Sequence, residues 1–190
     1  MDESVRRLDA RGLKVLAHPL RVRMLGTLRN DGPATATQLA HRLGESTGTT
    51  SWHLRQLAEH GFIEEDPDRG TRRDRWWRAR SRATELLVRD FTDQPELLGV
   101  IGIYLQSVLE NSFARAADFI AHGEDWSPAW QDAATFSDAT LRLDPAGLQA
   151  LNEELFEVIA RHRAAATEAG DVAGELVIVQ VQSFPRGAAR

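Results

Sequence analysis

Helix-start signals at Thr35 and Ser46 constrain the fold of this chain more than any other feature. Thr35 and Gln38 have the spacing of a capping box, and Gly44 predicts that this helix ends after about two turns. Ser46 is placed to cap a second helix, which Gly61 ends. The inner face of the second helix follows the spacing i, i+4, i+7 and i+8 and consists of Thr50, Leu54, Leu57 and Ala58. Two short helices joined by a tight turn predict a helix-turn-helix.

Two short strands are predicted directly after this motif. Residues 62–65 and 75–78 have the composition of strands, and the segment 67–70 between them has that of a turn. Trp76 and Trp77 fall on opposite faces of the second strand, so one of them is expected in the core. A hairpin in this position predicts the wing of a winged helix.

Two further helices are predicted before the helix-turn-helix. The first has apolar residues at helical spacing from Val5 to Leu16 and ends before Pro19. The second begins at Pro19 and ends at residues 30–33, and its apolar face consists of Leu20, Met24, Leu25 and Leu28.

Residues 13–78 resemble the winged-helix domain of the arsenic-repressor-type (ArsR-type) transcriptional regulators, particularly the actinobacterial branch with a long C-terminal extension. The resemblance rests on AHPLRVRML at 17–25, QLAHRLG at 38–44, SWHLRQLAEHGFI at 51–63 and the arginine-rich wing that ends in Trp76 and Trp77. It implies a winged-helix fold that binds an operator, with repression as the expected outcome.

The chain departs from the metal-sensing members of that family. Those members use cysteines beside the recognition helix, and this chain has none, which excludes thiolate metal sites and disulfides. The family's other metal site uses Asp and His on the helix after the wing. Asp118 and His122 have the i, i+4 spacing of two ligands, but a pair is half a site, and a solvated helix end is the alternative. We therefore predict no metal and no other cofactor.

Charge is unevenly distributed along the chain. Residues 1–82 hold 16 Lys and Arg against 11 Asp and Glu, whereas residues 83–190 hold 7 against 17, within a net charge of -5. Seven arginines lie between Arg69 and Arg82. A basic front part in an acidic protein predicts contact with a polyanion, and the alternative is a chance distribution.

The second helix of the motif is expected to enter the major groove, with its first two turns nearest the bases. The predicted contacts with double-stranded DNA there are Thr47, Gly48, Thr50, Ser51, Trp52 and Arg55. Hydroxyl groups can bond phosphates or base edges, Gly48 permits close approach, and Arg55 can bond guanine at two atoms. Thr50 has the alternative of facing the core, and Trp52 suits core packing as well as thymine methyl groups or sugars.

The wing supplies the other predicted DNA contacts, which are Arg69, Arg72, Arg73 and Arg75. Guanidinium groups gathered in a hairpin beside a helix-turn-helix favour phosphate contact over the alternative of a solvated turn.

The rear part of the chain is predicted to be a dimerisation domain. A capping box at 93–96 precedes a helix that is apolar on more than one face from Leu97 to Ile120, so it is expected to pack against its own domain and a second copy. Residues 139–143 alternate as a strand, a helix begins at Pro145, and residues 175–184 form a final predicted strand. The predicted fold class is thus α+β, with a winged helix at 1–90 and a helix-strand-helix-strand domain at 91–190.

Composition narrows the class of protein. A hydrophobic share of 42% with 27% charged residues is typical of a soluble globular chain. No apolar run approaches the length that a bilayer requires, and no secretory signal is visible. A cytoplasmic protein is expected. No set of residues has the pattern of a catalytic site, so we do not predict an enzyme.

These observations predict a dimeric DNA-binding transcriptional regulator that represses. The alternative is a protein-interaction module whose winged helix no longer binds DNA. A small-molecule effector could bind between the rear helix and strands, where candidate walls are Tyr104, Trp126, Trp130 and Phe136, or these aromatic residues could simply fill core.

Overall fold

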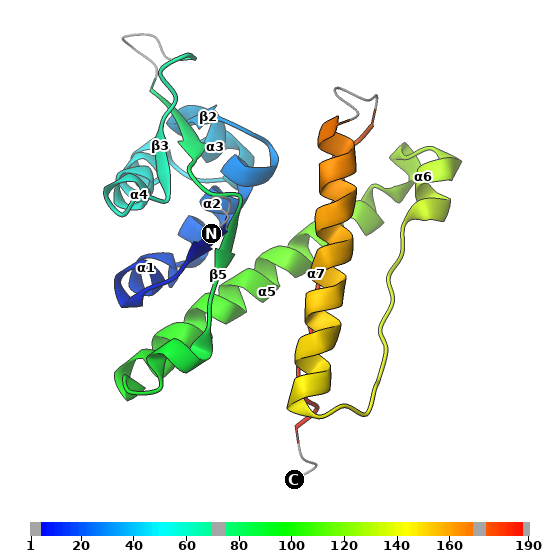
Figure 1. Ribbon diagram of the computed structural model, residues 1–190. Coiled ribbons are helices and arrows are strands. Elements are labelled where there is room, and N and C mark those ends of the chain that lie inside the picture. Colours follow the sequence, from blue (N-terminus) through cyan, green and yellow to red (C-terminus); the bar gives the residue numbers. More distant parts are fainter. Residues whose placement is uncertain (1–4, 70–74, 169–173, 188–190) are drawn as a thin grey trace. The chain divides into compact units, whose positions relative to one another are not determined.

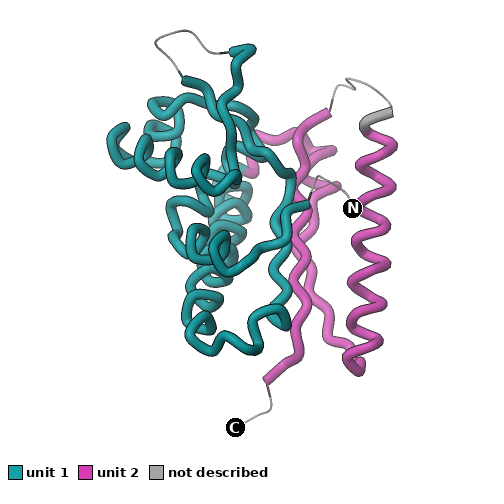
Figure 2. The backbone as a smooth tube through the Cα atoms, turned by 60° about the vertical axis from the view of Figure 1, so that its left-hand side comes forward, with its two compact units in different colours: residues 1–122 teal, residues 123–190 magenta. Residues whose placement is uncertain are grey.

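The computed structural model describes residues 5–69, 75–168 and 174–187. The chain forms two compact units, Met1–His122 (unit 1) and Gly123–Arg190 (unit 2), which Figure 2 shows in different colours. Unit 1 contains both helices and strands. The described part of unit 2 contains helices and extended segments.

The first four helices begin and end where local caps dictate. They are α1 (Ala10–Leu16), α2 (Pro19–Asn30), α3 (Ala36–Leu43) and α4 (Thr47–Glu59) (Figure 1). Thr35 and Gln38 form the predicted capping box of α3, and Ser46 Oγ caps α4 by accepting the Thr49 N–H at 3.0 Å. Gly44 follows α3 with a φ of 69°, a left-handed conformation that glycine adopts at little cost. The predicted helix-turn-helix is therefore confirmed as α3 and α4.

The prediction of a helix from Val5 onward is wrong for its first residues. Val5–Arg7 forms strand β1, which pairs in parallel with β5 (Ala83–Glu85), and the Leu8 N–H continues this pairing with a bond of 2.9 Å to a β5 carbonyl. Helix α1 begins only after Asp9, whose side chain caps it by accepting the Gly12 N–H at 2.7 Å. Leu8 is buried as its apolar character indicated, but on extended backbone.

Three short strands form the antiparallel sheet of the wing. They are β2 (Ala34–Thr35), β3 (Ile63–Glu65) and β4 (Trp76–Ala79), with β4 in the middle. In the register of β3 and β4, Glu64 lies opposite Arg78. The predicted hairpin is confirmed, and residues 70–74 between its strands lie outside the described residues.

The first half of the long helix α5 (Leu98–Ala121) belongs to the core of unit 1. It follows two single-turn 3-10 helices, η1 (Val88–Phe91) and η2 (Pro95–Leu97), and contributes Ile101 and Tyr104 to the same buried cluster as α1 and α2. The compact units therefore divide after this helix, although the rear domain was predicted to begin at residue 91.

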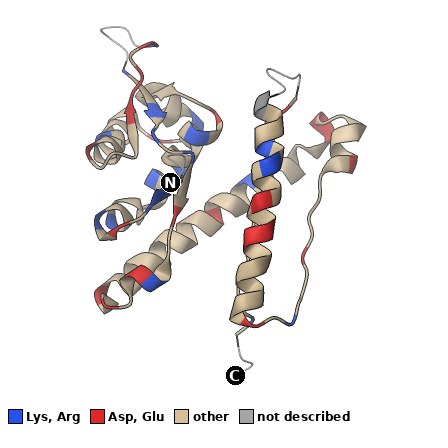
Figure 3. Cartoon of the chain, viewed as in Figure 1, with Lys and Arg blue, Asp and Glu red and all other residues tan. Residues whose placement is uncertain are grey.

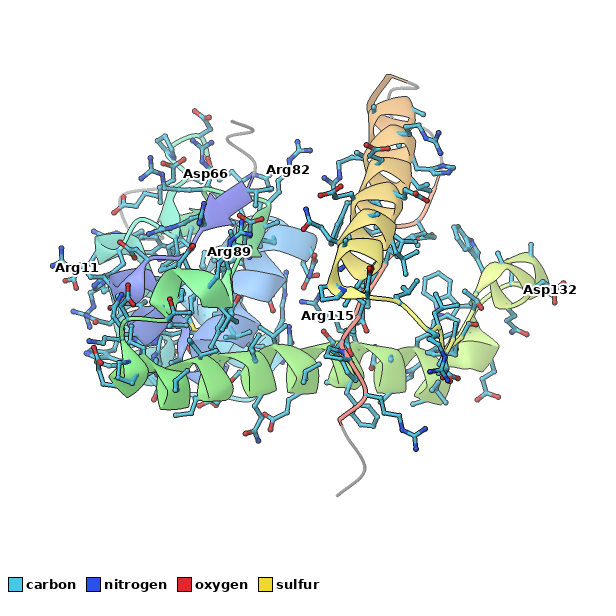
Figure 4. The ribbon with its side chains drawn as sticks, turned by 60° about the horizontal axis from the view of Figure 1, so that its bottom comes forward. Arg11, Asp66, Arg82, Arg89, Arg115 and Asp132 are labelled. Carbon is cyan, nitrogen blue, oxygen red and sulfur yellow. The ribbon has the colours of Figure 1, made fainter. Side chains whose placement is uncertain are left out.

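Close packing continues farther along α5. A Cβ atom on Gly26 of α2 would lie 2.6 Å from Nη2 of Arg115, so glycine leaves the room that this side chain occupies. Figure 4 labels Arg115 on α5. The side chain is partly buried, and desolvation lowers its pKa.

One helical segment among the described residues, Pro95–Ala121, is long and apolar enough to cross a membrane by length and composition, with a mean hydropathy of 1.3. This differs from the expectation that no apolar run has such a length. Packing against α1 and α2 accounts for one face of the helix, where Ile101 and Tyr104 are buried.

The described part of unit 2 is helical where it is regular. It contains η3 (Gly123–Asp125), α6 (Pro128–Ala133) and α7 (Pro145–Glu168), so the helix predicted at Pro145 is confirmed. The predicted strands at 139–143 and 175–184 are wrong, because these segments run without a hydrogen-bonded neighbour among the described residues (Figure 1). The predicted helix-strand-helix-strand order fails for this reason, since a strand needs a partner for its backbone hydrogen bonds.

Candidate nucleic-acid interface

Helix α4 has one face fixed in the core and the opposite face exposed. Leu54 and Leu57 are fully buried on the inner side. Gly48, Trp52 and Arg55 recur at spacings of four and three residues on the outer side, where all three are exposed. The buried side of α4 therefore fixes which of its residues face outward.

Most of the predicted contacts of α4 lie where a DNA duplex could reach them. Thr47, Gly48 and Arg55 are exposed, and Ser51 is half-buried. Arg55 Nε donates to the Ser51 carbonyl of its own helix at 3.3 Å, a weak contact that leaves the other guanidinium N–H groups available.

Thr50 is the exception among these predictions. Its side chain is fully buried on the inner face of α4, so the alternative that it faces the core is correct, and its side chain cannot contact DNA. The spacing i, i+4, i+7 puts Thr50 on the same helix face as Leu54 and Leu57, and so already indicated that Thr50 faces the core.

Thr49 is a candidate contact that the sequence reasoning missed. It is exposed in the first turn of α4, and its hydroxyl lies 2.8 Å from Ser46 Oγ. Glu59 also lies on the outer stripe, where its carboxylate accepts a hydrogen bond from Gln56 at 3.0 Å. A helical wheel of α4 with Thr50 facing the core places both Thr49 and Glu59 toward solvent.

Trp52 lies at the surface rather than in the core. Half of its surface is exposed, and its ring meets His53 edge to face with centroids 4.7 Å apart. One edge is therefore fixed by the domain while the rest of the indole is available to a partner.

A polar cluster lies behind α4, where α4 meets the start of α2. His18 and His53 have ring centroids 4.4 Å apart. Burial lowers the pKa of both imidazoles, and the Arg21 guanidinium lowers both further. Burial therefore favours the neutral form of both rings. Three buried atoms of this region have no hydrogen-bond partner among the described residues, namely Arg21 Nε, Thr50 Oγ1 and His53 Nδ1.

The wing arginines face carboxylates across the hairpin. Arg75 Nε is 2.8 Å from Glu65 Oε1, and Arg69 Nε is 3.7 Å from Asp66 Oδ2. Glu64 accepts from both Arg78 and Arg80, at 2.9 and 3.3 Å. Figure 3 shows both acidic and basic residues along the wing. The wing is consequently less positive than its arginine count indicated, and Arg72 and Arg73 lie outside the described residues.

The two tryptophans of the wing divide as predicted. Trp77 is 6% exposed and belongs to the core, whereas Trp76 is half-buried. Each has an arginine near its ring, with Arg69 at 6.0 Å from the Trp76 centroid and Arg75 at 5.6 Å from the Trp77 centroid.

Arg29 of α2 ties the helices to the chain that leaves the wing. Its guanidinium donates to the Ser81 carbonyl at 2.9 Å, to Ser81 Oγ at 3.0 Å and to Thr84 Oγ1 at 2.7 Å. Burial lowers its pKa to about 10, so it remains charged at neutral pH although its bonding partners are neutral oxygens. This contact was not predicted, because nothing local in the sequence pairs residue 29 with residues 81 and 84.

The predicted effector walls lie in different units. Tyr104 is 7% exposed in the core of unit 1, and burial raises its pKa. Trp126 and Trp130 contact each other edge to face within unit 2, with centroids 6.3 Å apart. A cleft of about 390 Å³ is present instead beside β1, where Arg7 and Asp90 pair through bonds of 2.7 and 2.6 Å at its wall.

One comparison with known proteins identifies a domain in the front part of the chain. A family model described as a helix-turn-helix domain matches residues 16–66. The crystal structure of RV1404 from Mycobacterium tuberculosis is similar at 19% sequence identity and a TM-score of 0.31, over 63% of this chain and 74% of that chain. A comparison with curated proteins found no match. The chain thus contains a helix-turn-helix domain, here followed by a wing, and this class of domain indicates a DNA-binding regulator.

Proposed function

We propose that this protein is a sequence-specific transcriptional regulator of the arsenic-repressor type, with α4 as its recognition helix. The exposed stripe of Gly48, Trp52 and Arg55 carries the proposal, because it combines a close-approach position, an aromatic face and a guanidinium on one outer helix face. The buried Leu54 and Leu57 hold this stripe in place. Occupancy of an operator in the cytoplasm would then repress transcription.

Binding measurements with a matched control test this proposal. Operator sequences are selected from a random duplex pool, and affinities are measured by fluorescence anisotropy at one fixed salt concentration. Arg55→Ala should cost about 1 to 3 kcal/mol at one base position and little on random DNA. Arg142→Ala, which removes an exposed arginine of unit 2, should change neither. A pool with no enriched sequence would favour a protein-interaction module instead.

We also propose that the protein acts as a dimer through α5. One face of this helix is apolar and exposed along its whole length, formed by Leu98, Leu105, Leu109, Phe113 and Ile120. It lies opposite the face that packs on α1 and α2. A two-fold dimer would place the two α4 helices about 34 Å apart, one turn of DNA.

Sedimentation measurements test the dimer separately from DNA binding. Phe113 is 75% exposed, so Phe113→Asp should leave the fold intact while placing a carboxylate in the dimer contact. We expect the variant to sediment as a monomer at micromolar concentration. Glu110→Ala, an exposed change on a neighbouring face, should not alter the mass. A natural chain that sediments as a monomer would contradict the proposal.

A further inference from the structure

Within residues 123–166 and 174–187, where the structure describes the side chains, unit 2 has no buried residue of its own. Its apolar side chains are nevertheless large and numerous, and Phe136, Phe156 and Phe184 are 62%, 58% and 76% exposed. Exposed apolar side chains in such numbers usually mark an interaction site, because each side chain gains free energy when it leaves water.

Helix α7 carries the most regular part of this surface. Its apolar residues advance by alternating steps of three and four, as Leu148, Leu151, Leu155 and Val158. His162 and Ala165 continue the same line. This is the heptad spacing with which two helices pack side by side. The centre of the line is open, since Leu155 is 37% and Val158 is 40% exposed.

Charges beside this line are complementary to those of a second copy of α7. Glu154 and Arg161 each precede a residue of the line by one position, and neither has a hydrogen bond or ion pair within the described part of the chain. Figure 3 shows acidic residues followed by basic residues along the helix. Two antiparallel copies would set Leu155 opposite Val158 and bring Glu154 of each toward Arg161 of the other. A parallel pair would instead place Ile159 beside Glu154.

We propose that α7 is a self-association surface that packs antiparallel against α7 of a second copy of this chain. The inference rests on the proposed dimer, to which it adds a second contact made by unit 2. Two helices of this length pair weakly alone, but a contact through α5 would raise their effective concentration. The heptad residues exclude water at the seam, and the two symmetric Glu154 and Arg161 pairs fix the antiparallel direction.

Disulfide trapping tests the contact directly, because the natural chain contains no cysteine. Leu155 lies close to the two-fold axis of the proposed pair, so Leu155→Cys should give a cross-linked dimer under mild oxidation. Glu153→Cys places the thiol on the opposite face of α7, at a position that is also exposed, and should remain uncross-linked. Equal cross-linking of the two variants, or none in either, would overturn the proposal.

A charge exchange in the Leu155→Cys chain tests the direction of pairing. Arg161→Glu should reduce cross-linking, since Glu154 of one copy then faces a second carboxylate. Adding Glu154→Arg should restore it, because the pair is complementary again with its signs exchanged. If Arg161 served only its own helix through Glu157, four residues earlier, the double variant would not recover. Lack of recovery would therefore overturn the antiparallel pairing.

The same samples separate this inference from the proposed function. Sedimentation and operator binding are measured for the natural chain and the Leu155→Cys chain. A protein that sediments as a dimer and binds its operator, yet gives no cross-link at residue 155, would refute the α7 contact alone. A protein that sediments as a monomer would refute both the α7 contact and the dimer.

Discussion

Arg29 provides a quantitative test of how the wing is held on the helices. Its three hydrogen bonds from a charged donor contribute about 1.5 to 3 kcal/mol each. Burying the charge opposes this by about 3 kcal/mol, the free energy that corresponds to lowering the pKa of Arg29 to about 10. Arg29→Met removes both effects and leaves the Ser81 carbonyl and two hydroxyls without their donor. We expect a net loss of about 1.5 to 6 kcal/mol in the free energy of unfolding.

Urea unfolding followed by tryptophan fluorescence measures this loss, since Trp52, Trp76 and Trp77 all lie in unit 1. Arg29→Lys keeps the charge but not the planar fork, so it should lose about half as much as Arg29→Met. Arg89→Met, at an exposed arginine of η1, should change stability by less than about 0.5 kcal/mol. If Arg29→Met is as stable as the natural chain, the hydrogen bonds do not hold the wing and the reasoning is wrong.

Three further predictions concern the same unit. The folded-state pKa values of His18 and His53 are lowered from 6.5, so unit 1 should keep its full stability above about pH 6.5 and become less stable as the pH falls through the folded values. His53→Gln should weaken this loss of stability, which urea titrations at several pH values measure. Gly44→Ala should lower the free energy of unfolding by about 1 kcal/mol in thermal unfolding, because residue 44 has a φ of 69° after α3. Gly99→Ala within helix α5 is the control and should not destabilise, because a Cβ atom there has no neighbour within 4 Å. Arg75→Ala should lower the slope of log affinity against log salt by less than about one, because Glu65 already neutralises part of the charge of Arg75. If the slope falls by about one, the ion pair of Arg75 with Glu65 opens when the protein binds DNA.

The helices of the front part could be predicted because their signals are local. The capping box at Thr35, the cap at Ser46 and the turn at Gly44 each depend on residues within one helical turn, and the structure has all three. The inward spacing of Leu54 and Leu57 is equally local. Strand β1 could not be found in this way, because only its distant partner β5 makes Val5–Arg7 extended.

The candidate interface and the rear part of the chain were predicted less completely, each for a physical reason. Residue counts do not show which charges face each other, so the pairing of Arg78 with Glu64 and of Arg75 with Glu65 across the hairpin was missed. Alternating apolar residues at 139–143 and the apolar segment at 175–184 indicated strands, but neither pattern shows whether a neighbouring strand is present to complete a sheet.

The pairing of β1 with β5 sets the order in which unit 1 can be completed. β1 is synthesised before the helix-turn-helix, yet its hydrogen-bonding partner Ala83–Glu85 follows the entire wing. The loop between them must close before the pairing contributes anything, so the contact order of this winged helix exceeds what its short helices alone would give. A nascent chain can therefore form α3 and α4 early from local signals, while β1 stays unpaired until β5 has been synthesised.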